Sequence, residues 1–176
     1  MSKYGIISEP GTLRFERLLP GSIDRVWSFL TESEKRAKWL ASGEMELFKG
    51  GRVQLNFHHA NLSAEDETVP DKYKKYEAGD VMIGRITDYD PPRLLSYTWG
   101  PGEDSEVSFH LTPAEENVQL VLTHSKLADN RDVLLSVASG WHTYLTLLTD
   151  HLNGRKPSGF WSTHTRMEEK YGQRLR

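Results

Sequence analysis

Three polar side chains stand on otherwise apolar faces of the sequence pattern: Tyr97, His124 and Tyr144. Phenol and imidazole groups donate and accept hydrogen bonds, and a histidine titrates near neutral pH, so such residues orient bound small molecules or transfer protons. The indole N–H groups of Trp99 and Trp141 add two further donors. These residue types predict either a binding pocket or a site of acid–base catalysis.

His124 is the residue on which these two predictions diverge. It ends a strand-like run in which Leu120 and Leu122 share its parity, so its imidazole belongs to an otherwise apolar face. It is interpreted as a core histidine with satisfied hydrogen bonds, as a pocket residue that contacts a ligand, or as a catalytic base. The sequence pairs no base with an orienting carboxylate, which favours binding over catalysis.

Other kinds of reactive site find little support. His58 and His59 are adjacent at a strand end and point to opposite faces, and His142 and His151 fall on opposite sides of a helix, so their spacing predicts no metal site. The chain has no cysteine, which excludes thiol nucleophiles and cysteine-ligated metal centres. It also lacks a Gly-x-Ser-x-Gly motif and a phosphate-binding loop. No cofactor is expected.

Length and charge limit the partners. The 176 residues suit one domain, and 37% of them are hydrophobic. The net charge of -3 provides no basic field for nucleic acid. No apolar run approaches the ~20 residues of a membrane span, and residues 1–10 do not resemble a secretory leader. We expect a cytoplasmic protein with neither nucleic acid nor membrane as a partner.

The elements that must position these side chains follow from hydrophobic periodicity. Alternation predicts a first strand at 12–19, and helical spacing then predicts two short helices at 22–30 and 33–40. Further strands are expected at 44–48, 52–58, 81–89, 93–100, 105–112 and 117–126, the first two as a hairpin. A long amphipathic helix capped by Asp132 follows and ends at about residue 153. Only this helix is long enough to cover the apolar face of the sheet.

This order predicts an α+β helix-grip fold. A curved antiparallel sheet of six to seven strands wraps around the long C-terminal helix, with two short helices after the first strand. The predicted domain covers residues 12–154, with an N-terminal arm at 1–11 and an acidic loop insertion at 60–79. Residues 155–176 form a basic extension in which Thr165 and Glu168 suggest a capping box for a short helix.

Three motifs stand out along the chain: the run from Gly84 to Trp99 (GRITDYDPPRLLSYTW), the LTHS sequence at 122–125, and the Gly140-Trp141 pair. Together they resemble the bacterial activator-of-heat-shock-protein-90-ATPase-like family of the START-like (SRPBCC) superfamily. The resemblance covers about residues 12–154 and implies a ligand cavity between the sheet and the long helix. It implies no shared catalytic set.

The inner face of the sheet and the long helix supply the predicted pocket, in which Trp99 and Trp141 approach each other. The candidate ligand-binding residues are Phe57, Tyr97, Trp99, Phe109, Leu122, His124, Trp141, Tyr144 and Leu148. The leading hypothesis is binding of an apolar or aromatic small molecule. The alternatives are a cyclase or hydrolase that uses His124 or Tyr97 in the same cavity, and a co-chaperone that stimulates a heat-shock protein 90 ATPase.

The extension carries a further open question. Phe160 and Trp161 either pack back onto the domain or form a contact with a partner, for example in a homodimer.

Overall fold

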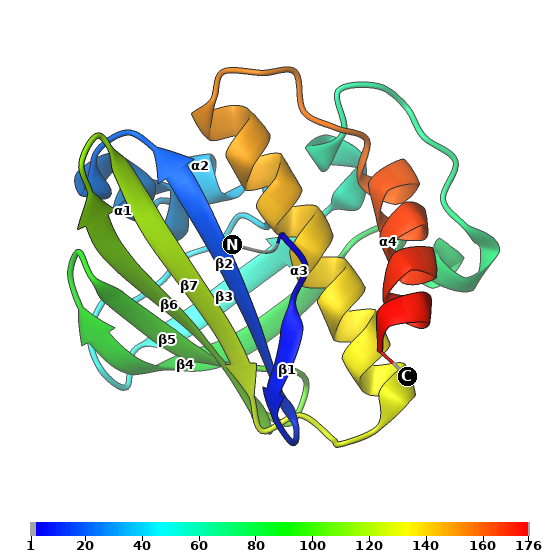
Figure 1. Cartoon of the computed structure of the whole chain (residues 1–176), viewed down its shortest axis with the longest axis horizontal. Coiled ribbons are helices and arrows are strands. Elements are labelled where there is room, and N and C mark those ends of the chain that lie inside the picture. Colours follow the sequence, from blue (N-terminus) through cyan, green and yellow to red (C-terminus); the bar gives the residue numbers. More distant parts are fainter. Residues whose placement is uncertain (1–2, 176) are drawn as a thin grey trace.

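The computed structural model describes residues 3–175 and contains one antiparallel sheet gripping one long helix (Figure 1). The strands are β1 (Ile6–Glu9), β2 (Thr12–Pro20), β3 (Arg52–Phe57), β4 (Asp80–Asp90), β5 (Leu94–Trp99), β6 (Ser105–Ala114) and β7 (Asn117–Ser125). The helices are α1 (Ile23–Thr31), α2 (Ser33–Arg36), α3 (Arg131–Leu152) and α4 (Phe160–Arg174), with two short 3-10 helices, η1 (His59–Leu62) and η2 (Asp71–Tyr76). The sheet order is β1-β2-β7-β6-β5-β4-β3, so the predicted helix-grip fold is confirmed.

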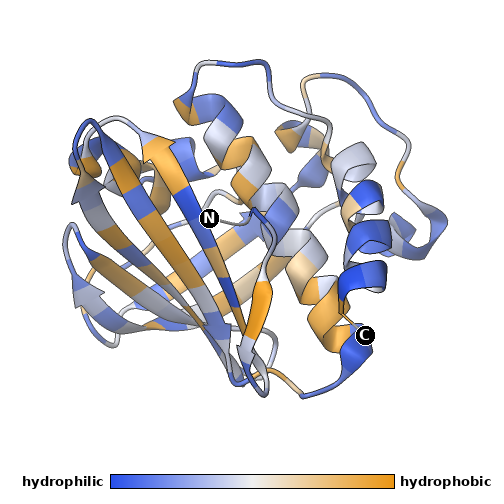
Figure 2. Ribbon diagram, viewed as in Figure 1, coloured by the Kyte–Doolittle hydropathy of each residue, from blue (hydrophilic) through white to orange (hydrophobic). Residues whose placement is uncertain are grey.

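The strands form because apolar and polar residues alternate along them. In β7, Val118, Leu120, Leu122 and His124 are all fully buried, whereas the residues between them are partly exposed. The resulting apolar stripes run across neighbouring strands (Figure 2). They face α3, which crosses the concave side of the sheet and provides the other half of the core.

Helix α3 starts earlier than its sequence pattern indicates. Asn130, rather than the predicted Asp132, is the N-cap, and its side-chain oxygen accepts hydrogen bonds from the backbone N–H groups of Asp132 and Val133. Asp132 lies in the first turn, where its negative charge interacts favourably with the positive end of the helix dipole.

Two strands differ from the prediction. β1 lies inside the expected N-terminal arm, where all four residues are exposed and leave no alternating pattern to detect. Residues 44–48 do not form a strand, because this segment contacts β3 only through isolated bridges such as Met45 to Val53. Glycines constrain this segment: Gly43 has a φ of 126°, and Gly51 approaches the carbonyl of Glu46 too closely for any side chain.

Helix α2 is also shorter than predicted, and it ends at a buried arginine. The guanidinium of Arg36 is fully buried and donates hydrogen bonds to the carbonyl oxygens of Leu30, Thr31, Ala41 and Gly43. Two of these carbonyls belong to the C-terminal turn of α1, where the helix dipole favours a cation. Arg36 therefore fixes α1 to the segment that leads into β3.

Helix α4 begins at Phe160, so the expected capping box is wrong: Thr165 lies inside the helix. Phe160 and Trp161 are buried, with exposures of 2% and 6%, which confirms that they pack back onto the domain. Figure 1 shows α4 beside α3, with the segment that follows β3 on its other side.

Candidate functional site

An open cleft of about 650 Å³ lies beside the core, where β3, β4 and β5 meet α3, α4 and the segment that links β3 to β4. Such a volume is typical of small-molecule sites. The side chains that define its chemistry are aromatic or imidazole groups: Phe57, His59, Tyr73, Tyr76, Trp99, Tyr144, Phe160, Trp161 and His164. Its wall therefore combines aromatic rings with polar groups, and the apolar share is the larger of the two.

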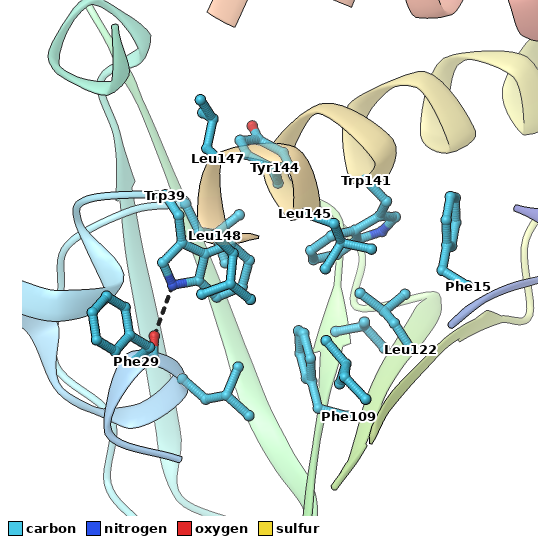
Figure 3. Packing of buried hydrophobic residues seen from close by; sticks show 14 of the residues in the cluster. Phe15, Phe29, Trp39, Phe109, Leu122, Trp141, Tyr144, Leu145, Leu147 and Leu148 are labelled. Atoms are coloured by element: carbon cyan, nitrogen blue, oxygen red, sulfur yellow. Dashed lines mark hydrogen bonds between the residues drawn. The ribbon is translucent and has the colours of Figure 1, made fainter. Parts of the chain in front are cut away.

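The structure divides the predicted pocket residues into two groups. Phe57, Trp99 and Tyr144 line the cleft. The other six lie behind it, in core that is filled by its own side chains (Figure 3), and each is at most 2% exposed: Tyr97, Phe109, Leu122, His124, Trp141 and Leu148. The space between the middle of the sheet and α3 is occupied by tight packing, and the cleft lies to one side of it.

His124 has both ring nitrogens engaged inside this core. Trp141 Nε1 donates to His124 Nδ1 at 2.8 Å, and His124 Nε2 lies 2.8 Å from Ser105 Oγ, which donates in turn to the carbonyl of Trp99. Because Nδ1 accepts, Nε2 carries the proton and donates to Ser105. Burial lowers the pKa of His124 to about 4, so the imidazole is neutral at pH 7. Of the three interpretations of His124, the geometry matches the satisfied core histidine.

Trp99 connects the core to the cleft. Its ring centroid lies 4.9 Å from that of Trp141, so the expected approach of these two residues is confirmed. On its other side Trp99 meets Phe57 edge-on at 5.8 Å, and both side chains line the cleft.

The far wall of the cleft comes from residues that the sequence analysis did not select. His59 stacks on Phe160 with a centroid distance of 4.5 Å, and Tyr73 stacks on Trp161 at 5.2 Å. The first residue of each pair belongs to the β3–β4 link and the second to α4. The opposite charges of the acidic loop and the basic extension are the sequence signal that these two segments meet.

Ion pairs join the same two segments. Glu168 on α4 accepts from Lys72 Nζ at 2.6 Å and from Tyr73 Oη at 2.9 Å, and Lys156 pairs with Glu65. Lys72, Lys156 and Glu65 are exposed, so these pairs add little free energy each. They join the same two segments that carry the stacked aromatic side chains.

Glu67 caps α4 from a distance. Its carboxylate accepts from the backbone N–H groups of Trp161 and Ser162 at 2.8 and 3.0 Å and from Ser63 Oγ at 2.8 Å. Partial burial acts to raise the pKa of Glu67, but the hydrogen bonds from Ser162, Ser63 and the helix backbone outweigh it and the pKa is lowered. Gly159, at the N-cap, leaves room for this carboxylate.

Replacing Glu67 with alanine is expected to lower the free energy of unfolding by about 1–2 kcal/mol, since two helix N–H groups lose their charged acceptor. Urea denaturation followed by circular dichroism measures this loss. The matched control is Glu65→Ala, which removes only an exposed ion pair and is expected to leave the free energy of unfolding close to the wild-type value. Equal losses in the two variants would contradict the capping role.

The imidazoles in the cleft are neutral at pH 7. Burial, with smaller contributions from the neighbouring His164 and His58, lowers the pKa of His59 to about 4. Burial also lowers the pKa of His164, although the nearby Glu168 carboxylate opposes this shift. Within residues 3–175, no three His, Asp or Glu side chains are arranged to hold a metal ion. None of the described helices is long and apolar enough to cross a membrane.

Comparison with known proteins agrees with the fold. The family described as "Activator of Hsp90 ATPase homolog 1-like protein" matches residues 20–153. Among solved structures, the protein encoded by gene BPP1335 of Bordetella parapertussis is 44% identical; the match covers 99% of this chain and 91% of that chain, with a TM-score of 0.82. No curated protein matches the chain.

Two more distant structures share the fold. CalU16 from Micromonospora echinospora is 21% identical, with 93% of this chain and 85% of that chain covered and a TM-score of 0.67. DynU16, from the dynemicin biosynthetic locus, is 18% identical; the match covers 84% of this chain and 49% of that chain, with a TM-score of 0.64. Together with the match over residues 20–153, the helix-grip architecture shows that this chain belongs to the Activator of Hsp90 ATPase homolog 1-like family, of START-like type.

Proposed function

We propose that the protein binds an apolar or aromatic small molecule in the cleft between the sheet, α3 and α4. The volume of about 650 Å³ accommodates such a ligand, and the aromatic side chains around it offer flat apolar contact area. The cyclase or hydrolase alternative was tied to His124 or Tyr97, and neither side chain lines this cleft. Binding is therefore the function that the geometry supports best.

Gly140 is the observation that carries this proposal. It lies in the interior of the 22-residue helix α3 and lines the cleft. A Cβ at this position would meet only Tyr144 Cε2, at 4.0 Å, so no protein atom requires a glycine here. An interior glycine destabilises a helix by roughly 0.5–1 kcal/mol relative to alanine. The glycine leaves open the space beside α3 that a ligand in the cleft would occupy.

Filling this space is expected to abolish binding without unfolding the protein. Gly140→Leu places a branched side chain in the cleft, and we expect at least a tenfold weaker affinity for the neutral fluorescent probe N-phenyl-1-naphthylamine. Probe fluorescence titration measures the affinity, and urea denaturation measures stability. Gly140→Ala is expected to raise the free energy of unfolding by about 0.5–1 kcal/mol.

Gly172→Ala on α4 is the matched control for the helix-propensity effect, because this glycine is helical but lies outside the cleft. Its affinity for the probe should equal that of the wild type. Unchanged probe binding by Gly140→Leu would show that the cleft is not the binding site.

A further inference from the structure

A hydrogen-bonded pair, His59 and Tyr144, supplies polar atoms inside the aromatic cleft. His59 Nε2 lies 2.9 Å from Tyr144 Oη, and both residues line the cleft. His59 is held in place by stacking on Phe160, and Tyr144 packs against Trp141 at 5.8 Å. The Tyr144 oxygen points away from Leu145 and the core beneath it (Figure 3). The pair therefore has a fixed geometry before any ligand arrives.

The other nitrogen of His59 decides which partner donates. Nδ1 is buried and has no hydrogen-bond partner. A proton on Nδ1 would leave a buried N–H unsatisfied, whereas an unpaired acceptor is tolerated more often in folded proteins. The proton is therefore assigned to Nε2, which donates to Tyr144 Oη. Because Tyr144 Oη accepts this hydrogen bond, its own hydrogen is not used in the pair and can be donated to a ligand in the cleft.

Both groups keep these protons at neutral pH. The pKa of His59 is about 4, so a neutral imidazole holds one ring proton. Burial raises the pKa of Tyr144, which keeps the phenol protonated. The cleft thus presents an uncharged donor whose direction is set by His59.

The charge around the cleft restricts the ligand further. The carboxylate of Asp80 lies on the wall, the two imidazoles are neutral, and the described lining contains no Lys or Arg. The ammonium groups of Lys72 and Lys75 lie over the rings of the lining residues Tyr73 and Tyr76, at 5.2 and 5.0 Å, and Lys72 is paired with Glu168. Among the lining residues themselves, the carboxylate of Asp80 disfavours an anionic ligand beside it. The aromatic side chains of Trp99, Phe57 and Trp161 line the cleft and favour a flat ring system.

We infer that the cleft selects uncharged, planar aromatic molecules that carry a carbonyl oxygen, and that Tyr144 Oη donates a hydrogen bond to this oxygen. His59 acts as a positioning residue, because it holds the Tyr144 hydroxyl through Nε2 and turns its hydrogen outward. This assignment rests on the proposed binding function and adds the chemical class of the ligand.

Fluorene and 9-fluorenone test the assignment, because they share a flat tricyclic shape and differ by one carbonyl group. Wild-type protein is expected to bind fluorenone about 5-fold to 10-fold more tightly than fluorene, the ratio given by one net hydrogen bond. In Tyr144→Phe the two affinities should become equal through loss of fluorenone affinity alone. Fluorenone-2-carboxylate should bind more weakly than fluorenone to both proteins. Competition with N-phenyl-1-naphthylamine measures all of these affinities.

A vibrational measurement on the wild type gives a test that does not depend on the variant. The carbonyl stretching frequency of bound fluorenone should shift to lower wavenumber relative to an apolar solvent, as it does on accepting a hydrogen bond. Equal affinities for fluorene and fluorenone, or an unshifted carbonyl band, would overturn the assignment and leave the proposed binding function standing. If no aromatic probe binds, the proposed function itself fails.

Discussion

Replacing Arg36 with methionine is expected to lower the free energy of unfolding by about 3 kcal/mol or more. The change leaves the carbonyls of Leu30, Thr31, Ala41 and Gly43 without their donor, and each buried unsatisfied group costs about 1–3 kcal/mol. Removing a buried charge recovers part of this sum, because the guanidinium no longer has to be desolvated. The loss dominates, since methionine cannot donate to any of the four oxygens.

Urea denaturation at pH 7 measures the effect on Arg36→Met. Lys35→Met is the matched control on the same helix: its ammonium is well exposed and contacts Ser28 and Glu32 near the surface. This control is expected to change stability by less than about 0.5 kcal/mol. A loss below about 1 kcal/mol in Arg36→Met would show that the four carbonyls find other donors.

Acidification is expected to destabilise the protein between pH 6.5 and pH 4, well before most carboxylates titrate. The pKa of His124 falls from 6.5 to about 4 on folding because the imidazole is buried. Between these values the unfolded chain binds more protons than the folded one, so stability is complete above pH 6.5 and is lost as the pH falls. From pH 7 to pH 4.5, His124 alone accounts for about 2–3 kcal/mol of this loss.

The variant His124→Gln separates this contribution from the others. Glutamine can accept from Trp141 Nε1 and donate to Ser105 Oγ, yet it does not titrate. The free energy of unfolding of His124→Gln should fall by about 2–3 kcal/mol less than that of the wild type over the same pH range. His110→Gln makes the same substitution at an exposed position of β6 and serves as the matched control. Parallel curves for His124→Gln and the wild type would contradict the assignment.

The sequence predicted the sheet and α3 well because their signals are local. In β7, every second residue from Val118 to His124 enters the core, so its parity is visible in a few residues. Strand parity for Trp99 and helical periodicity for Trp141 placed these residues on facing elements, and the structure brings their rings together. β1 escaped detection because Ile6 and Ile7 are both exposed and its pairing with β2 alone defines it.

The cleft could be predicted only in part, for a physical reason. Phe57, Trp99 and Tyr144 lie on regular elements, and their direction follows from periodicity. His59 and Phe160 meet across about 100 positions of sequence, and no local pattern encodes that contact. The start of α4 was missed for a similar reason, since its capping carboxylate belongs to Glu67 rather than to a neighbouring residue.

The β3–β4 link and α4 form the outer wall of the cleft, whereas the sheet and α3 form the core that supports it. The core depends on residues such as His124 and Trp141, which are joined by a buried hydrogen bond, so few other side chains can replace them. The outer wall offers half-buried positions such as Tyr73 and Tyr76, which line the cleft away from that network. Helix α4 also lies beyond the segment that matches the family, residues 20–153. A library randomised at Tyr76, which leaves the stacking of Tyr73 on Trp161 in place, is therefore a direct route to new ligand preferences on an unchanged scaffold.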